Sequence, residues 1–114
     1  MSITLNTRTA GDVTIMDVSG RIVLGEETGT LRREIRTLVE KGCVRILLNM
    51  SGVTYVDSSG VGELVAAYVS VRKEGGTMKL VSLPARLEEL LLVTKLCVIF
   101  DILEGEDQAI HSFA

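Results

Sequence analysis

The stretch VTYVDSSGVGELV, residues 53–65, holds the side chains of this chain that are best suited to chemistry. Within it stand a carboxylate, two hydroxyls and two glycines: Asp57, Ser58, Ser59, Gly60 and Gly62. They lie between an apolar run and a segment with helical spacing. Such side chains at such a junction suit three roles, which are a helix cap, a nucleophile and a site for a covalent switch.

The cap and the nucleophile require different surroundings. Asp57 or Ser58 is a good N-cap because its side-chain oxygen can accept a hydrogen bond from an unpaired backbone N–H of the first turn. A catalytic serine needs a base within hydrogen-bond reach, and the only histidine, His111, is among the last four residues. Asp57 alone is too weak a base at neutral pH. The sequence therefore predicts that the protein is not an enzyme.

The sequence also predicts no metal and no other cofactor. The stretch from Gly60 to Gly62 lacks the third glycine of a dinucleotide fingerprint, and no phosphate-binding G-x-x-x-x-G-K-[ST] occurs. Histidines, cysteines and carboxylates do not cluster as a metal site requires. Cys43 and Cys97 are far apart and flanked by aliphatic residues. We expect two buried free thiols in a reducing compartment.

A covalent switch remains open beside the cap. A phosphate on a hydroxyl in the first turn of a helix would lie near unpaired N–H groups, so the fold would tolerate it. A docked partner would tolerate it less, because two like charges ~5 Å apart cost roughly 3 kcal/mol at an effective dielectric near ~20. Since about 1.4 kcal/mol is a factor of ten in affinity, one phosphate can weaken binding about a hundredfold.

Composition limits the class of protein. With 114 residues, 46% of them hydrophobic, the chain is expected to form a single domain over residues 1–114. The net charge of −3 argues against nucleic acid, and the group Arg32, Arg33 and Arg36 is expected to be a solvated helix face. No secretory signal and no apolar run near the ~20 residues of a membrane span is present. We expect a cytoplasmic protein without direct membrane insertion.

Hydrophobic periodicity predicts the elements that position residues 57–62. Alternation and short apolar runs predict strands over 3–9, 13–20, 43–50 and 78–83, with a further short strand within 96–103. Spacings of three and four predict helices over 26–41, 58–73, 84–91 and 106–113, with Pro84 in the first turn of the third.

The order of these elements predicts an α/β fold. Gly11 and Asp12 form a turn that joins the first two strands as an antiparallel hairpin. The later strand–helix–strand units are expected to be parallel and right-handed. Together they give a mixed sheet of four to five strands with helices packed on it. Sites in such sheets collect at the carboxyl ends of strands, where the DSSG tetrapeptide is expected to lie.

The run VRILLNMSGVTYVDSSGVGEL, residues 44–64, and the order of elements resemble the STAS domain, the sulfate transporter and anti-sigma factor antagonist fold. The resemblance is strongest to the small free-standing anti-sigma factor antagonists and covers essentially the whole chain. VSGRI at 18–22, the acidic helix start at Glu26 and Glu27, the pair Gly75-Gly76 and the strand MKLVSL add to it.

The resemblance implies a phosphorylation switch. In that family an anti-sigma factor, which is also a serine kinase, phosphorylates the first serine of D-S-S-G, and that position here is Ser58. The unphosphorylated antagonist binds the kinase and frees a sigma factor. The phosphorylated antagonist lets go, and a serine phosphatase resets it.

The resemblance also assigns roles to the neighbours of Ser58. Asp57 would orient the loop, Ser59 would support it, and Gly60 and Gly62 would let a partner backbone approach closely. The rest of the docking surface would come from Gly20, Arg21, Ile22 and Glu26. An alternative role is that of an accessory or scaffold subunit in a transport, lipid-trafficking or stressosome-type signalling complex.

Overall fold

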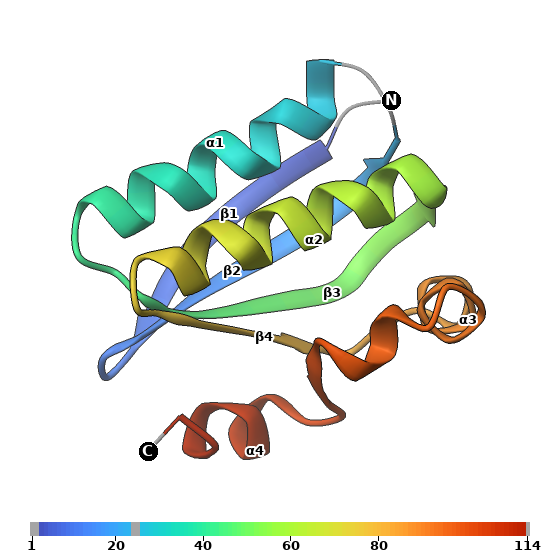
Figure 1. The fold of residues 1–114 in the computed structure, drawn as a ribbon. Coiled ribbons are helices and arrows are strands. Elements are labelled where there is room, and N and C mark those ends of the chain that lie inside the picture. The colour runs from blue at the N-terminus through green and yellow to red at the C-terminus, as the bar shows by residue number, and fades with distance from the viewer. Residues whose placement is uncertain (1–2, 24–25, 114) are drawn as a thin grey trace.

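The computed structural model describes residues 3–23 and 26–113, apart from the side chains of residues 26–28. Figure 1 shows a twisted sheet with α1 and α2 on one face and α4 on the other. The strands are β1 (Ile3–Ala10), β2 (Val13–Ile22), β3 (Arg45–Val56), β4 (Thr77–Val81) and β5 (Asp101–Leu103). The helices are α1 (Glu26–Glu40), α2 (Ser58–Lys73), α3 (Ala85–Val93), the 3₁₀ helix η1 (Leu96–Val98) and α4 (Glu106–His111).

The sheet has five strands in the order β1-β2-β3-β4-β5. β1 and β2 are antiparallel and stay in register from Ile3↔Gly20 to Ala10↔Val13, and Gly11 makes the turn with a φ of 64°. The pairs β2–β3, β3–β4 and β4–β5 are parallel. The predicted mixed α/β sheet with its initial hairpin is confirmed.

β3 is longer than predicted, because it runs through Ser51 and Gly52 to Val56 instead of ending near residue 50. Its last residues pair with β2 alone, since its ladder with β4 ends at Asn49↔Val81. The small polar pair 51–52 looks like the end of a strand in the sequence. Gly52 is needed for close packing, because a Cβ there would lie 2.7 Å from the Cβ of Ser19.

Apolar side chains form a cluster on each face of the sheet. The larger cluster lies under α1, α2 and α3 and includes Leu31, Ile35 and Leu64, all fully buried. This confirms the stripe that the sequence predicts for α1. The smaller cluster lies between the sheet and α4, and its buried members are Val13, Ile15, Leu47, Val81, Ala109 and Phe113.

The C-terminal half departs from the sequence predictions in detail. Pro84 is the N-cap of α3 and not part of its first turn. The segment 96–103 divides into η1 and a three-residue β5. Cys43 and Cys97 are free but only half-buried, so the prediction of two buried thiols was wrong. Within residues 3–23 and 26–113, no helix combines the length and apolar character needed to cross a membrane.

Candidate functional site

Asp57 caps α2. Its backbone is extended, with φ −112° and ψ −178°, and its Oδ1 accepts a hydrogen bond of 2.9 Å from the Gly60 amide. The Val61 amide donates to the Asp57 carbonyl at 3.1 Å and so makes a first helical hydrogen bond. The sequence left the cap between Asp57 and Ser58, and the structure assigns it to Asp57.

Ser58 and Ser59 follow the cap as the first two residues of α2, and both are exposed. Among the described residues, neither hydroxyl has a hydrogen-bond partner. Since Asp57 already satisfies the Gly60 amide, both hydroxyls are dispensable for the cap. The serines are therefore accessible, and the helix start does not depend on them.

The end of β2 lies directly beside this helix start. Arg21 pairs with Tyr55 and Ile22 with Val56, and the Asp57 amide donates to the Ile22 carbonyl at 3.4 Å. The structure thus brings together Gly20, Arg21 and Ile22 with the DSSG tetrapeptide, which we call the DSSG loop (residues 57–60). Glu26 begins α1, but its side chain lies outside the described part of the chain.

Gly60 and Gly62 differ in their surroundings. A Cβ on Gly60 would lie 2.1 Å from the carbonyl oxygen of Ile22, so the absent side chain lets α2 seat against β2. The close approach at Gly60 is thus to this chain's own backbone, and a partner's approach there stays a prediction. Gly62 is exposed, and a Cβ there would meet nothing within 4 Å.

Two residues near the loop escaped the sequence analysis. Tyr55 is 44% exposed, and the guanidinium of Arg21 lies 5.1 Å from the centre of its ring, in a cation–π contact. Glu63 of α2 forms an ion pair of 3.2 Å with Arg32 of α1, which ties the two helices together near the loop. Tyr55 precedes the loop by two residues and Glu63 follows Ser59 by four, so only the fold reveals their contacts.

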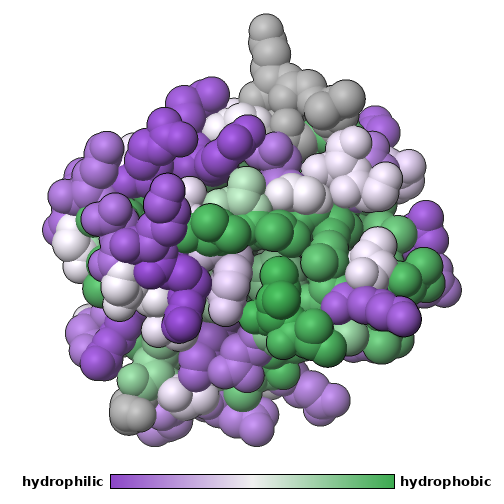
Figure 2. All heavy atoms as spheres, viewed as in Figure 1, coloured by the Kyte–Doolittle hydropathy of each residue, from purple (hydrophilic) through white to green (hydrophobic). Residues whose placement is uncertain are grey.

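Figure 2 shows hydrophobic side chains gathered near the middle of the face that carries α2, with hydrophilic side chains around them. Among the described residues, the large apolar side chains that are exposed are Tyr55, Val69, Leu92, Val93 and Val98. Val69 belongs to α2, the helix that Ser58 begins.

Among the described residues, neither a histidine nor a metal site lies beside the DSSG loop. His111, the chain's only histidine, is on α4, on the opposite face of the sheet from α2, and its Nδ1 lies 2.8 Å from the Asp107 carbonyl. Within the part of the chain that the structure describes, no three histidine, cysteine or carboxylate side chains come together as a metal site.

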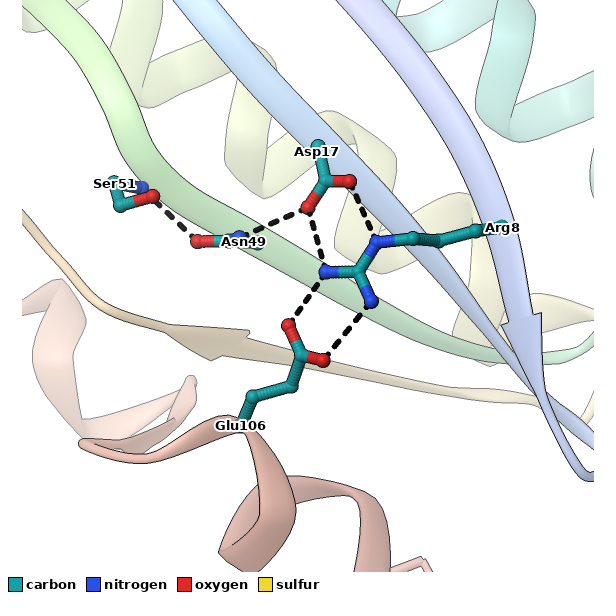
Figure 3. A network of polar contacts seen from close by, with 5 residues as sticks. All are labelled: Arg8, Asp17, Asn49, Ser51 and Glu106. Carbon is teal, nitrogen blue, oxygen red and sulfur yellow. Dashed lines mark hydrogen bonds and ion pairs between the residues drawn. The ribbon is translucent and has the colours of Figure 1, made fainter.

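A second polar cluster lies on the α4 face of the sheet and joins Arg8, Asp17, Asn49 and Glu106 (Figure 3). Hydrogen bonds from Arg8 are the main cause of a lowered pKa at Asp17 and at Glu106. The same bonds, first to Glu106 and then to Asp17, raise the pKa of Arg8 above its already high ordinary value. All three groups are therefore held in their charged forms at neutral pH.

The fold and the loop agree with a known family. A family model of the STAS domain matches residues 4–109. The chain belongs to the STAS domain family. This confirms the resemblance that the sequence predicts, with the DSSG loop inside the matched region.

Several proteins that are similar to this chain are named as anti-sigma factor antagonists. The anti-sigma-B factor antagonist of Bacillus subtilis is 41% identical over 73 residues, which are 63% of this chain. The match spans 65% of that relative's length, just under two thirds. A crystal structure of a candidate anti-sigma factor antagonist from Thermotoga maritima has a TM-score of 0.86 and 25% identity, over 95% of this chain and 92% of that one.

SpoIIAA, a cell fate determinant of Bacillus, has the same fold. In its phosphorylated form it matches with a TM-score of 0.75 and 17% identity, over 97% of this chain and 100% of its own. At this identity the likeness establishes the fold alone.

Proposed function

We propose that this STAS domain is an anti-sigma factor antagonist that phosphorylation of Ser58 switches off. In the unphosphorylated form it binds an anti-sigma factor that is also a serine kinase, and so frees a sigma factor. A serine phosphatase resets it. It works in the cytoplasm as a single domain, residues 1–114, by binding alone, without cofactor, nucleic acid or membrane insertion.

The observation that carries the proposal is the exposed hydroxyl of Ser58 at the first residue of α2, next to a cap that does not use it. The first amides of a helix have no acceptor within the helix and lie at the positive end of its dipole. A phosphate on Ser58 can accept hydrogen bonds from such amides. Modification of Ser58 therefore leaves the Asp57–Gly60 cap and the fold intact.

The same phosphate disfavours a docked partner. It adds about −1.5 to −2 charge beside Asp57, on a surface where the partner's backbone and side chains must approach. Repulsion of roughly 3 kcal/mol against a partner carboxylate corresponds to about a hundredfold weaker binding. A switch of this kind needs no change in the shape of the domain.

The proposed docking surface consists of the loop and the strand end beside it. Its members are Gly20, Arg21, Ile22, Glu26, Asp57, Ser58, Ser59, Gly60 and Gly62. Support comes from the contacts of Asp57 and Gly60 with Ile22 at the end of β2, from the similarity to the Bacillus subtilis antagonist, and from the shared fold with a protein whose phosphorylated form has been solved.

The first test is phosphorylation in vitro. The purified chain is mixed with ATP, magnesium and the serine kinase encoded nearest to it, and the phosphate is located by mass spectrometry. We expect phosphate on Ser58, which Ser58→Ala abolishes and Ser59→Ala retains. Phosphate on Ser59 alone would contradict the assignment of the site.

The second test is binding by calorimetry. We expect Ser58→Asp to weaken binding to the same kinase by about tenfold or more, because one negative charge mimics part of a phosphate. Gln108→Glu, which adds the same charge at an exposed position of α4 on the opposite face of the sheet, serves as the control. Equal binding by wild type and Ser58→Asp, together with co-purification with a membrane transport ATPase, would support the accessory-subunit alternative.

A further inference from the structure

β3 carries a bulge between the centre of the sheet and the DSSG loop. The β2–β3 ladder passes from Asp17↔Asn49 to Ser19↔Gly52, so Met50 and Ser51 on β3 lie opposite Val18 alone on β2. The β4 ladder ends at Asn49, and β3 bends partway along its length (Figure 1). A bulge bends its strand and redirects the residues beyond it. A second register shift, between Gly20↔Val53 and Arg21↔Tyr55, leaves Thr54 without a partner in the β2 ladder, and its Oγ1 donates to the Gly20 carbonyl at 3.1 Å before the strand reaches the loop.

Asn49 holds this bulge with both ends of its amide. Its Oδ1 accepts a hydrogen bond of 3.1 Å from the Ser51 amide, and its Nδ2 donates one of 2.9 Å to Oδ1 of Asp17 (Figure 3). Ser51 has no register partner on β2, and the Asn49 side chain supplies an acceptor for its amide. One side chain therefore stabilises the bulge and fixes it to β2.

Arg8 extends this contact to the C-terminal helix. Its Nε and Nη2 donate to Asp17 at 2.7 and 2.9 Å, and its Nη1 donates to Glu106 at 2.9 Å. A second bond joins Nη2 to the other Glu106 oxygen, so the guanidinium bridges both carboxylates. Paired hydrogen bonds between arginine and a carboxylate fix direction as well as distance. A continuous hydrogen-bonded chain thus runs from α4 through β1 and β2 to the bulge of β3.

We infer that Asn49 and Asp17, held by Arg8 and Glu106, are positioning residues for the DSSG loop, and that the docking of α4 is coupled to the loop's geometry. The coupling follows from the ladders. Beyond the bulge, β2 and β3 pair with each other and β3 no longer contacts β4 through its ladder. The Asp57 amide and Gly60 are seated on Ile22 at the end of β2. The direction that the bulge gives to the two strand ends is therefore passed to the loop.

Two neighbouring acidic residues of α4 provide a matched test. Glu106→Gln and Asp107→Asn each remove one negative charge from the first turn of α4, and of these two residues Glu106 is the one that contacts Arg8. Amide hydrogen exchange is measured by NMR on the full chain at Ser51, Gly60 and Leu80. The Leu80 amide in β4 is the internal reference, because global destabilisation would accelerate all three amides.

We expect Glu106→Gln to accelerate exchange at Ser51 and Gly60 about fivefold relative to Leu80, whereas Asp107→Asn leaves these ratios unchanged. Asn49→Ala should have the larger effect, because it removes the acceptor of the Ser51 amide. In the double variant Asn49→Ala/Glu106→Gln the two effects on exchange should not add, since both act through one chain of contacts.

Equal effects of Glu106→Gln and Asp107→Asn at Gly60 would overturn the coupling, and so would acceleration confined to α4. Additive effects in the double variant would do the same. None of these outcomes depends on a kinase. The consequence for function rests on the proposed phosphorylation, and we expect Ser58 to be phosphorylated about fivefold more slowly in Glu106→Gln than in Asp107→Asn, because a displaced loop presents its hydroxyl less well. Changed exchange without any phosphorylation of Ser58 would contradict the proposed function and leave the positioning role standing.

Discussion

The helices α1, α2 and α3 cover one face of the sheet with a continuous apolar core, whereas α4 covers the other with a small apolar cluster and several charged contacts. On the first face, Gly60 packs against the backbone of Ile22. On the second, Arg8 and Lys79 hold the C-terminal residues through Glu106 and Ser112. A closely packed face is destabilised when a substitution changes the volume of a side chain. Charged contacts are weakened when one of the groups changes its protonation state or when the salt concentration rises.

The face covered by α1, α2 and α3 is called the packed face below. The two glycines of α2 offer the sharpest test of it. Gly60→Ala should destabilise the protein by about 2–3 kcal/mol, because its Cβ would lie 2.1 Å from a backbone oxygen that cannot rotate away. Gly62→Ala, two residues along the same helix and facing open space, should stabilise it by about 0.5–1 kcal/mol. Urea unfolding of both variants measures the difference. Equal effects would show that α2 does not depend on its close seat against β2.

Local patterns in the sequence predict most of the packed face. Leu31 and Ile35 recur at helical spacing and are buried under α1, and Asp57 stands before a helical repeat and caps α2. These features depend on neighbours within one or two turns. The position of the DSSG loop also follows from the general rule for α/β sheets, because the loop comes directly after a strand.

The contacts on the face covered by α4, called the charged face below, could not be predicted in the same way. Arg8 and Glu106 are 98 residues apart, and nothing in the periodicity of either segment indicates that they meet. The extension of β3 was missed because Ser51 and Gly52 have the composition of a strand end. Only the structure shows that Oδ1 of Asn49 accepts a hydrogen bond from the Ser51 amide and that the strand continues through a bulge.

Lys79 tests how far α4 depends on charge. Its side chain is largely buried, and Nζ donates at 2.9 Å to both the carbonyl and the hydroxyl of Ser112 and lies 4.8 Å from the centre of the Phe113 ring. Lys79→Met keeps much of the volume but removes both donated bonds and the cation–π contact. We expect a loss of about 1–2 kcal/mol in denaturant unfolding, with faster hydrogen exchange over residues 106–113.

The control for Lys79 is its ion-pair partner Asp101, 3.2 Å from Nζ and 63% exposed at its side chain. Asp101→Asn should cost less than about 0.5 kcal/mol, because solvent screens such a pair. A loss in Asp101→Asn as large as that in Lys79→Met would indicate that the ion pair, and not the contacts with Ser112, holds the C-terminus.

Acid should weaken the charged face through Asp17 and Glu106, whose pKa values Arg8 lowers in the folded protein. A depressed folded pKa contributes stability above the unfolded value, which is near ~4, and this contribution is lost as the pH falls through the folded value. The side chains are a third or more exposed, so the contribution should be only about 0.5–1 kcal/mol. Arg8→Met should therefore be less stable than wild type at neutral pH and about equal to it at strongly acidic pH. A gap in unfolding free energy that stays constant over this range would show that Arg8 stabilises the protein by packing and not through its charged contacts with Asp17 and Glu106.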